Sequence, residues 1–495
     1  MEYCKNFNVR NERNLTMLVD FYELTMGNGY LESGMGDTIA YFDMFFRRIP
    51  DEGGYCIMAG VQQLMEYLSS LKFTVDDIEY LRSKDMFSEK FLDYLSNFKF
   101  SSDVWAVPEG TPVFPNEPLI TVKGPAIQAQ IIETMVLITI NHQTLIATKA
   151  NRICRAAGNR SVMEFGSRRA QGYDAAIYGS RAAYIGGCSS TACTIAEEMF
   201  GIPAVGTMAH SWIQLFDNEY EAFEQWTKVN PHNCVLLVDT YNVLKSGLPN
   251  AIKVFDNILK PLGIRPKGIR IDSGDITYLT RKCREILDEA GYEDVGIVIS
   301  NSLDEFIIRD VLSQGASIDS LGVGERLITA KSEPVFGGVY KLCAVEDKNT
   351  GIITPKIKIS ENEEKITNPG FKKVYRIFDK KADKAMADLI TLNDEHLDTN
   401  SSIEIFDPVY TWKKKRIKDY YIKDLMVKIF DKGQCIYESP DVVDIRNYAK
   451  TETEKLWPEV LRFENPHNYY VDLSRPLWEL KQQLIQKYSD EYEEK

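Results

Sequence analysis

Seven short runs of apolar and β-branched residues, all between positions 160 and 326, end in polar or glycine residues, and a helical pattern follows each run. The polar ends lie 20 to 32 residues apart, a spacing that suits βα units. Such units force parallel strands and right-handed crossovers. The repeat predicts an α/β fold, in which an irregular seven-stranded α/β barrel would collect its chemistry at the carboxyl ends of the strands.

The sequence on either side of the repeat predicts different structure. Helical spacing over 15–31 should be interrupted by the glycines at 27–29, and the proline-rich stretch 104–122 indicates an edge-rich sheet. One long helix is predicted over 127–157, a hairpin over 425–439 and a last helix over 476–488. We expect three domains: an N-terminal α+β domain (1–128), the barrel as catalytic domain (129–340) and a C-terminal domain that partly completes the β-rich domain (341–495).

The net charge of the chain disfavours some classes of binding partner. The chain has 58 Lys and Arg against 72 Asp and Glu, a net charge of −14. Its field would repel nucleic acid and anionic membranes, so any phosphate site must be local, and the basic run 413–416 is interpreted as a solvated turn. The nine scattered cysteines form no C-x-x-C pair. With no apolar signal or spanning segment, they predict a cytoplasmic protein with reduced thiols.

Two of the strand ends suggest binding of a phosphorylated sugar. LGVGER at 321–326 places two glycines where backbone N–H groups could cradle an anion, although a tight βα turn would use the same residues. RIDSGD at 270–275 supplies a guanidinium, two carboxylates and a hydroxyl. The acids could hold Mg²⁺ or ribose hydroxyls, and a plain turn would explain the serine and glycine but not both acids and the arginine.

Two further strand ends suggest a ring site and a reactive imidazole. In EFGSRR at 164–169, Phe165 could stack on a flat ring while Arg168 or Arg169 meets a carboxylate or phosphate, or these residues could be a core ring and a surface pair. GTMAHS at 206–211 presents His210 beside Thr207 and Ser211, although a lone histidine is more often structural. Together these ends predict one pocket for transfer at an activated phosphoribose. The other four histidines are interpreted as structural: His142, His232, His396 and His467.

The stretches DFYELTMGNGY, EFGSRRAQG, GTMAHS, LLVDTYN, IRIDSGD and LGVGERL resemble nicotinate phosphoribosyltransferases nearly from end to end. The resemblance implies a type II phosphoribosyltransferase fold. It also implies formation of nicotinate mononucleotide and pyrophosphate from nicotinate and phosphoribosyl pyrophosphate, coupled to ATP hydrolysis, in NAD salvage. ATP and Mg²⁺ are the implied cofactors, and a homodimer is implied.

The resemblance also implies roles for single residues. His210 matches the histidine that ATP phosphorylates, and Asp272 matches an acid close to the ribose and to Mg²⁺. Tyr22 and Phe165 match the pair that sandwiches the pyridine ring, with Tyr22 donated by the neighbouring subunit. The remaining matches are with nicotinate contacts at Arg168, Thr207 and Arg270, with the 5′-phosphate loop at Gly322, Val323 and Gly324, and with strand ends of unassigned role at Ser211, Asp239 and Asn301.

Three alternatives share some of these features. Nicotinamide phosphoribosyltransferases resemble the chain too, but they carry an aspartate after the second barrel strand, where this chain has GGCSSTA at 186–192 and no acid. An aspartate there would repel the nicotinate anion, so the acid substrate is favoured. Quinolinate phosphoribosyltransferases are shorter. A non-catalytic scaffold would have no need for Arg270, Asp272 and His210 together.

Overall fold

The computed structural model describes residues 14–493, and the chain divides into two compact units. The first unit joins the residues up to Leu145 with those from Val335 onward, and the second is the inserted segment Ile146–Pro334. Helix α6 (Glu133–Ala157) carries the chain from the first unit into the second. The inserted unit falls within the segment 129–340 expected to be catalytic, and the three-domain division stays a prediction.

The second unit is built on a parallel sheet with the order β7-β6-β11-β10-β9-β8. An isolated parallel bridge joins Thr191 to Ala204 beside β7. The α/β class is therefore confirmed, whereas closure of the sheet into a barrel stays a prediction. The strands are β6 (Ser161–Glu164), β7 (Ser190–Thr191), β8 (Val235–Leu237), β9 (Gly268–Ile271), β10 (Gly296–Asn301) and β11 (Ser320–Val323).

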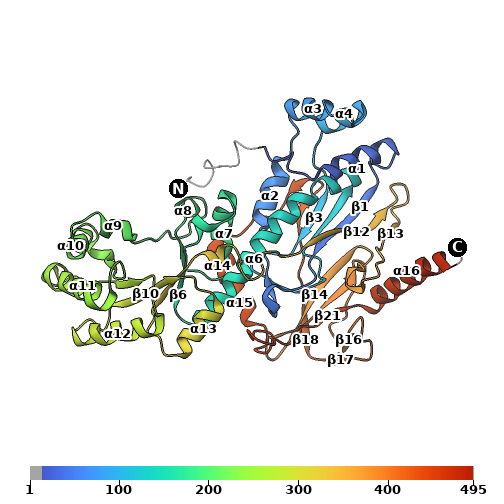
Figure 1. Ribbon diagram of the computed structural model, residues 1–495. Coiled ribbons are helices and arrows are strands. Elements are labelled where there is room, and N and C mark those ends of the chain that lie inside the picture. The colour runs from blue at the N-terminus through green and yellow to red at the C-terminus, as the bar shows by residue number, and fades with distance from the viewer. Residues whose placement is uncertain (1–13, 494–495) are drawn as a thin grey trace. The chain divides into compact units, whose positions relative to one another are not determined.

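Helices follow these strands and lie beside them (Figure 1). Helix α12 shows why the local sequence is helical: Asp275 caps its first turn by accepting the N–H of Tyr278, and Thr280, Cys283 and Leu287 form one buried face. The α-helices are α7 (Tyr173–Ile185), α8 (Thr194–Phe200), α9 (His210–Gln214), α10 (Glu219–Val229), α11 (Leu248–Val254), α12 (Ile276–Glu289), α13 (Glu305–Ser313) and α14 (Glu325–Ile328). Shorter 3₁₀ or π turns are η2 (Ser167–Arg169), η3 (Pro231–Asn233), η4 (Val243–Gly247), η5 (Phe255–Leu259) and η6 (Lys260–Leu262).

The first unit contains an antiparallel sheet with the order β13-β12-β1-β5-β3-β19-β20. Its strand β1 pairs with β5 on one side and with β12 on the other, where Ile39 lies opposite Glu346. The predicted hairpin is confirmed by β19 and β20. The strands are β1 (Ile39–Phe45), β3 (Asp103–Ala106), β5 (Ile120–Pro125), β12 (Val339–Glu346), β13 (Ile353–Pro355), β19 (Val427–Asp431) and β20 (Gln434–Cys435).

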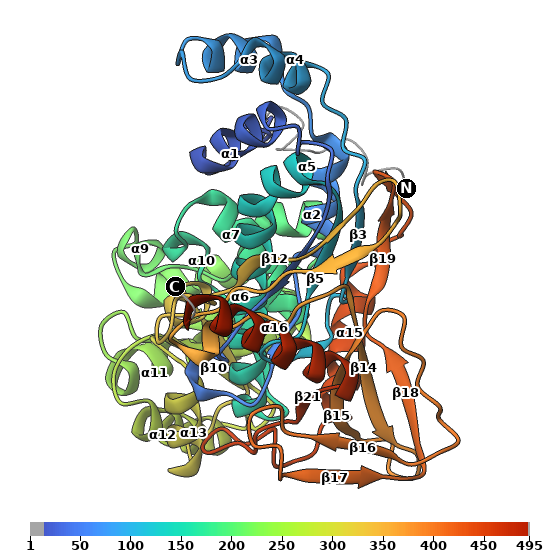
Figure 2. The ribbon, with the colours of Figure 1, turned by 90° about the vertical axis from the view of Figure 1, so that its right-hand side faces the viewer.

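Three smaller sheets complete this unit. A four-stranded sheet has the order β18-β14-β15-β21, and helix α16 contacts β15 (Figure 2). The pair β16·β17 contains the basic run 413–416, so the turn predicted there is wrong: these side chains are exposed, but 414–417 form a strand that pairs with 403–406. The strands are β2 (Cys56–Ile57), β4 (Pro112–Val113), β14 (Lys372–Asp379), β15 (Ala385–Leu392), β16 (Ile403–Phe406), β17 (Lys414–Ile417), β18 (Tyr420–Asp424) and β21 (Val471–Leu473).

The helices of the first unit correct two predictions. Helix α1 continues through its glycines, because Gly27 is buried where a Cβ would lie 3.1 Å from the Phe91 ring. The single helix predicted over 127–157 is divided at Ile132 into α5 and α6. The helices are α1 (Phe21–Glu32), α2 (Val61–Ser70), α3 (Val75–Arg82), α4 (Glu89–Ser96), α5 (Ala126–Ile131), α15 (Val442–Glu454) and α16 (Arg475–Glu493), with turns η1 (Pro50–Glu52) and η7 (Glu363–Lys365).

Two findings concern the whole described chain. None of the eight cysteines within the described residues belongs to a disulfide, and the ninth, Cys4, lies outside them. No helix between residues 14 and 493 is both long enough and apolar enough to cross a bilayer.

Candidate active site

The candidate site is formed where the parallel strands of the second unit end. All seven motifs selected from the sequence lie at such ends: six overlap or directly follow a strand from β6 to β11, and GTMAHS follows the bridge at Ala204. Because neighbouring parallel strands place their carboxyl ends at one edge of a sheet, the motifs can meet there. The hydrogen bonds below show that several of them do.

Arg270 and Asp272, at the end of β9, are joined through a hydroxyl of the next strand. Arg270 Nε donates to Ser300 Oγ at 2.6 Å, and Ser300 Oγ donates to Asp272 Oδ1 at 2.7 Å. Arg270 Nη1 also donates to Thr207 Oγ1 at 3.1 Å, which brings the loop before α9 to the same place. The nearest acid to Nη2 is Asp272, with Oδ1 at 3.6 Å. This nitrogen is therefore the part of the guanidinium best able to take an anionic group.

His210 begins α9 and faces the same carboxylate. Its Nδ1 lies 3.0 Å from Thr240 Oγ1, and its Nε2 lies 3.8 Å from Asp272 Oδ2. The Thr240 contact fixes the plane of the ring, while the second distance is longer than a hydrogen bond. The His210 side chain is 38% exposed, so the imidazole is open to solvent and to a reactant.

Asp239 follows β8 and supports the loop that carries Asp272. Its Oδ2 accepts the backbone N–H of Asp272 at 3.0 Å and the hydroxyl of Ser273 at 2.6 Å. Its Oδ1 is buried and has no hydrogen-bond partner among the described residues. A buried carboxylate oxygen without a partner is costly unless a donor or a cation reaches it. Asp239 Oδ1 could therefore bind a cation whose other ligands come from a bound reactant.

Phe165 provides a flat wall against the glycine strand. A Cβ on Gly322 would lie 2.4 Å from the Phe165 ring, so only glycine lets β11 pass this closely. The Phe165 N–H donates to Val323 O at 2.7 Å, and a Cβ on Gly324 would lie 3.2 Å from Phe165 O. The Arg270 guanidinium lies 5.8 Å from the ring centroid. A planar ring with a carboxylate would find an aromatic face and a guanidinium side by side.

Behind this wall, Glu164 anchors the end of β6. The fully buried carboxylate accepts hydrogen bonds from Gly166 N, from Ser180 Oγ and, at 2.7 Å, from Thr191 Oγ1. Burial raises the pKa of Glu164, and these hydrogen bonds oppose the rise. Its three partners hold it in the interior, so its role is to fix the loop that carries Phe165.

Five predicted residues do not join this network. Tyr22 belongs to α1 of the first unit, and its side chain is exposed. Arg168 and Arg169 are both exposed in η2, and Arg169 is close enough to Glu325 to help lower the pKa of that carboxyl. The other two are Ser211, exposed on α9, and Asn301, whose Oδ1 accepts its neighbour's N–H at 2.6 Å.

Two hydroxyls in the network were missed. Ser300 and Thr240 stand in ISNSLD and VDTYN, two of the seven motifs, but were given no role. Their only signal was position: each comes within three residues of a strand end, next to a strand that carries a candidate residue. A metal site made by the protein alone is not found, since the described residues contain no group of three or more His, Cys, Asp or Glu placed to bind an ion.

Comparison with known proteins gives consistent matches. Residues 17–141 match the nicotinate phosphoribosyltransferase (NAPRTase) N-terminal domain, and residues 371–481 match the nicotinate phosphoribosyltransferase C-terminal domain. The chain is 43% identical to nicotinate phosphoribosyltransferase of Bacillus subtilis, with 97% of each chain covered. It is 33% identical to the Dictyostelium discoideum enzyme of that name, over 94% of this chain and 87% of the relative. The crystal structure of human nicotinic acid phosphoribosyltransferase superposes with a TM-score of 0.83 at 27% identity, over 94% of this chain and 100% of that one.

Proposed function

Because the chain belongs to the nicotinate phosphoribosyltransferase family, we propose that it transfers phosphoribose to nicotinate and couples this transfer to ATP hydrolysis through a phosphohistidine at His210. Phosphoribosyltransferase activity on nicotinate is supported by the relatives and by the human structure. The coupling rests on one observation in particular: the imidazole of His210 lies open beside the Arg270–Ser300–Asp272 network. NAD salvage in the cytoplasm is the proposed setting.

Nicotinate would bind through its carboxylate and its ring. The Nη2 group of Arg270 would donate to the carboxylate, and the ring would lie against Phe165. The loop of Gly322, Val323 and Gly324 would hold the 5′-phosphate through backbone N–H groups. Nicotinamide has no charge to meet the guanidinium, so the acid is the preferred base.

Transfer breaks the bond between C1 of the ribose and pyrophosphate, and the pyridine nitrogen forms the new bond to C1. Positive charge develops on the ribose ring, where the carboxylate of Asp272 would stabilise it. Asp272 and the unpartnered Oδ1 of Asp239 are oxygen donors of the kind that Mg²⁺ prefers, with the remaining ligands supplied by the reactants. Bound there, Mg²⁺ would neutralise charge on the departing pyrophosphate.

Phosphorylation would act on this site through charge. The His210 nitrogen takes the γ-phosphoryl group of ATP, and the P–O bond to ADP breaks. The new phosphate adds negative charge and acceptor oxygens next to Arg270, which would order the loops that hold the substrates. Water then cleaves the N–P bond, releases inorganic phosphate and restores the imidazole.

The coupling is tested with His210→Ala, and His232→Ala serves as a control at an exposed histidine on η3. The purified enzyme receives phosphoribosyl pyrophosphate and Mg²⁺, with nicotinate or nicotinamide, with and without ATP. We expect His210→Ala to retain weak transfer that ATP no longer stimulates, whereas the control remains stimulated. ATP hydrolysis by His210→Ala in step with product formation would refute the phosphohistidine, and equal use of both bases would refute the substrate preference.

The homodimer, with Tyr22 donated to the neighbouring subunit, is proposed because α1 exposes an apolar face. Tyr22, Leu18, Phe21 and Met26 are each more than a third exposed. Tyr22→Ala and His210→Ala subunits, each without ATP-stimulated activity alone, should complement each other after unfolding and refolding together. Random pairing makes about a quarter of the sites intact, so about a quarter of the ATP-stimulated activity should return. Recovery of none of it would argue against sharing of the site.

A further inference from the structure

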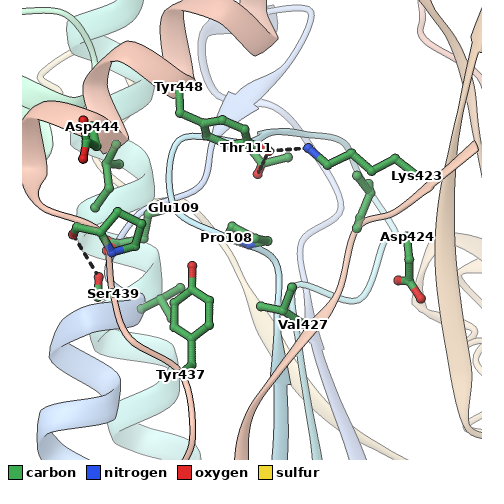
Figure 3. Close-up of a pocket in the computed structure, with 14 residues that line it drawn as sticks. Pro108, Glu109, Thr111, Lys423, Asp424, Val427, Tyr437, Ser439, Asp444 and Tyr448 are labelled. Atoms are coloured by element: carbon green, nitrogen blue, oxygen red, sulfur yellow. Dashed lines mark hydrogen bonds between the residues drawn. The ribbon is translucent and has the colours of Figure 1, made fainter.

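A cavity of about 410 Å³ lies within the first unit (Figure 3). Its walls come from the loop between β3 and β4, from the end of β18 and the start of β19, from the segment that follows β20, and from the first turns of α15. None of its lining residues belongs to the candidate active site. Its volume lies in the range of small-molecule sites.

The walls are largely apolar. Aliphatic side chains of Val61, Leu425, Val427 and Ile445 line the space together with Pro108. The rings of Tyr437 and Tyr448 close it on two sides, as Figure 3 shows. Such walls favour a ligand with an apolar body, and the electron-rich ring of Tyr437 favours one that also carries positive charge.

The single ammonium group in the lining is already paired within the protein. Lys423 Nζ donates to the Tyr448 hydroxyl at 2.7 Å and lies 3.6 Å from Glu452. It also lies 4.9 Å from the centroid of the Tyr448 ring. Thr111 Oγ1 is 3.4 Å from the same hydroxyl. These contacts make Lys423 part of the wall and leave it little capacity to hold an anion.

The other charged groups in the lining are carboxylates. Glu109 is only 6% exposed, and its Oε1 accepts the N–H of Gly60. Asp424 and Asp444 also line the cavity, both at exposed positions. The lining residues therefore carry three carboxylates and one ammonium, a net negative charge that favours a cation over an anion.

One polar group points into the cavity without a partner. The hydroxyl of Tyr437 is directed into the space in Figure 3, and no hydrogen bond joins it to another described residue. The side chain is half-buried, and burial, with Glu109 next, raises the pKa of its phenol. The phenol therefore stays neutral and offers its oxygen to a ligand near the Glu109 carboxylate.

We propose that this cavity binds a small organic cation, an amine or quaternary ammonium group carried on an aromatic or branched apolar body. The cationic group would lie against the Tyr437 ring and near Glu109, and the apolar body would fill the space beside Leu425 and Val427. Nicotinate, phosphoribosyl pyrophosphate and ATP are anions that the carboxylates would repel. The inference is therefore independent of the proposed function, and either one can fail alone.

Three probes that share a benzene ring test the role of charge: benzyltrimethylammonium, benzyl alcohol and benzoate. Binding to the full-length protein is measured by titration calorimetry and by saturation-transfer NMR. We expect the cation to bind about fivefold to tenfold more tightly than the alcohol, since one nearby charge is worth about that factor. Benzoate should not bind, and added salt should lower the affinity for the cation.

Substitution of carboxylates in the lining tests where the cation binds. Glu109→Gln keeps the acceptor for Gly60 N–H but loses the charge, and Asp444→Asn removes an exposed carboxylate at the rim. Each should weaken cation binding by about threefold to tenfold. Glu79→Gln, an exposed acid on α3, is the matched control and should change nothing. An unchanged melting temperature shows that each variant is folded.

The inference is wrong if benzoate or ATP occupies the cavity as tightly as the cation, or if none of the three probes binds. It is also wrong if the cation binds but neither Glu109→Gln nor Asp444→Asn weakens it, because the site would then lie elsewhere. Competition between the cation and nicotinate would likewise assign the cation to the catalytic network. Loss of ATP stimulation in His210→Ala has no bearing on these results, so the two proposals are tested separately.

Discussion

Replacement of Ser300 by alanine tests the network that joins the guanidinium to the carboxylate. Ser300 accepts from Arg270 Nε at 2.6 Å and donates to Asp272 Oδ1 at 2.7 Å, so one hydroxyl sets the position of two charged groups. Hydrogen bonds to charged partners are worth about 1.5–3 kcal/mol each. Loss of about 2 kcal/mol of transition-state binding lowers kcat/KM by about 30-fold.

The assay is steady-state kinetics with nicotinate and phosphoribosyl pyrophosphate varied in turn. Since Arg270 is proposed to bind nicotinate and Asp272 to act at the ribose, we expect both a higher KM for nicotinate and a lower kcat. The folding stability should fall by about 1–3 kcal/mol, because a buried hydroxyl that bonds two charged groups is lost, so the kinetics are measured where the variant is folded.

Ser302→Ala provides the matched control, because Ser302 is exposed two residues further along and its hydroxyl has no hydrogen-bond partner among the described residues. It should leave both kinetic constants unchanged. If Ser300→Ala retained full kcat/KM while remaining folded, the hydroxyl would not position the two charged groups, and the reasoning from these distances would be refuted.

Other substitutions test packing and charge in both units. Gly322→Ala should raise the KM for nicotinate and lower the free energy of unfolding by about 1–3 kcal/mol, because the new Cβ would meet the neighbouring aromatic ring at 2.4 Å; Gly29→Ala, with open space around it, should be tolerated in both assays. Burial raises the pKa of Glu23 from 4.5 to about 8, so the folded protein keeps a proton that the unfolded chain has released, and stability should decrease as pH rises from about 4.5 to 8. Glu23→Gln should flatten this trend in thermal melts at several pH values, and an unchanged slope would contradict it. Arg376→Met should cost about 3–5 kcal/mol in denaturant titrations by leaving Asp388 buried and unpaired, and the further change Asp388→Leu should restore part of the loss.

The location of the site was predictable because its charged and reactive side chains lie at the ends of strands. Arg270, Asp272 and His210 lie far apart in sequence, but parallel strands bring their carboxyl ends to a common edge. The sequence pattern could not show which hydroxyl would connect them. That depends on the register between β9 and β10, in which Val298 lies opposite Arg270. A register shift of one residue would turn Ser300 to the other face of the sheet.

The less accurate predictions came from local rules that tertiary packing overrides. Gly27 was expected to interrupt a helix, but its lack of a side chain is what allows α1 to approach Phe91 closely. The basic run at 413–416 has the composition of a turn, yet it pairs with β16 because one side of it leads into the buried Ile417. Both outcomes depend on the packing of segments outside the run itself, so neither could be predicted from a short window.

The division of the first unit between two distant stretches of chain also governs how the protein can be synthesised. Strand β1 is translated early, but its partner β12 emerges from the ribosome some 300 residues later. Until then one edge of β1 has no partner and depends on β5 or on a chaperone for protection. The inserted segment, whose strands pair only with one another, can meanwhile complete its own sheet. Nascent chains should therefore acquire a protease-resistant second unit first, and a premature stop before β12 should yield an aggregation-prone fragment.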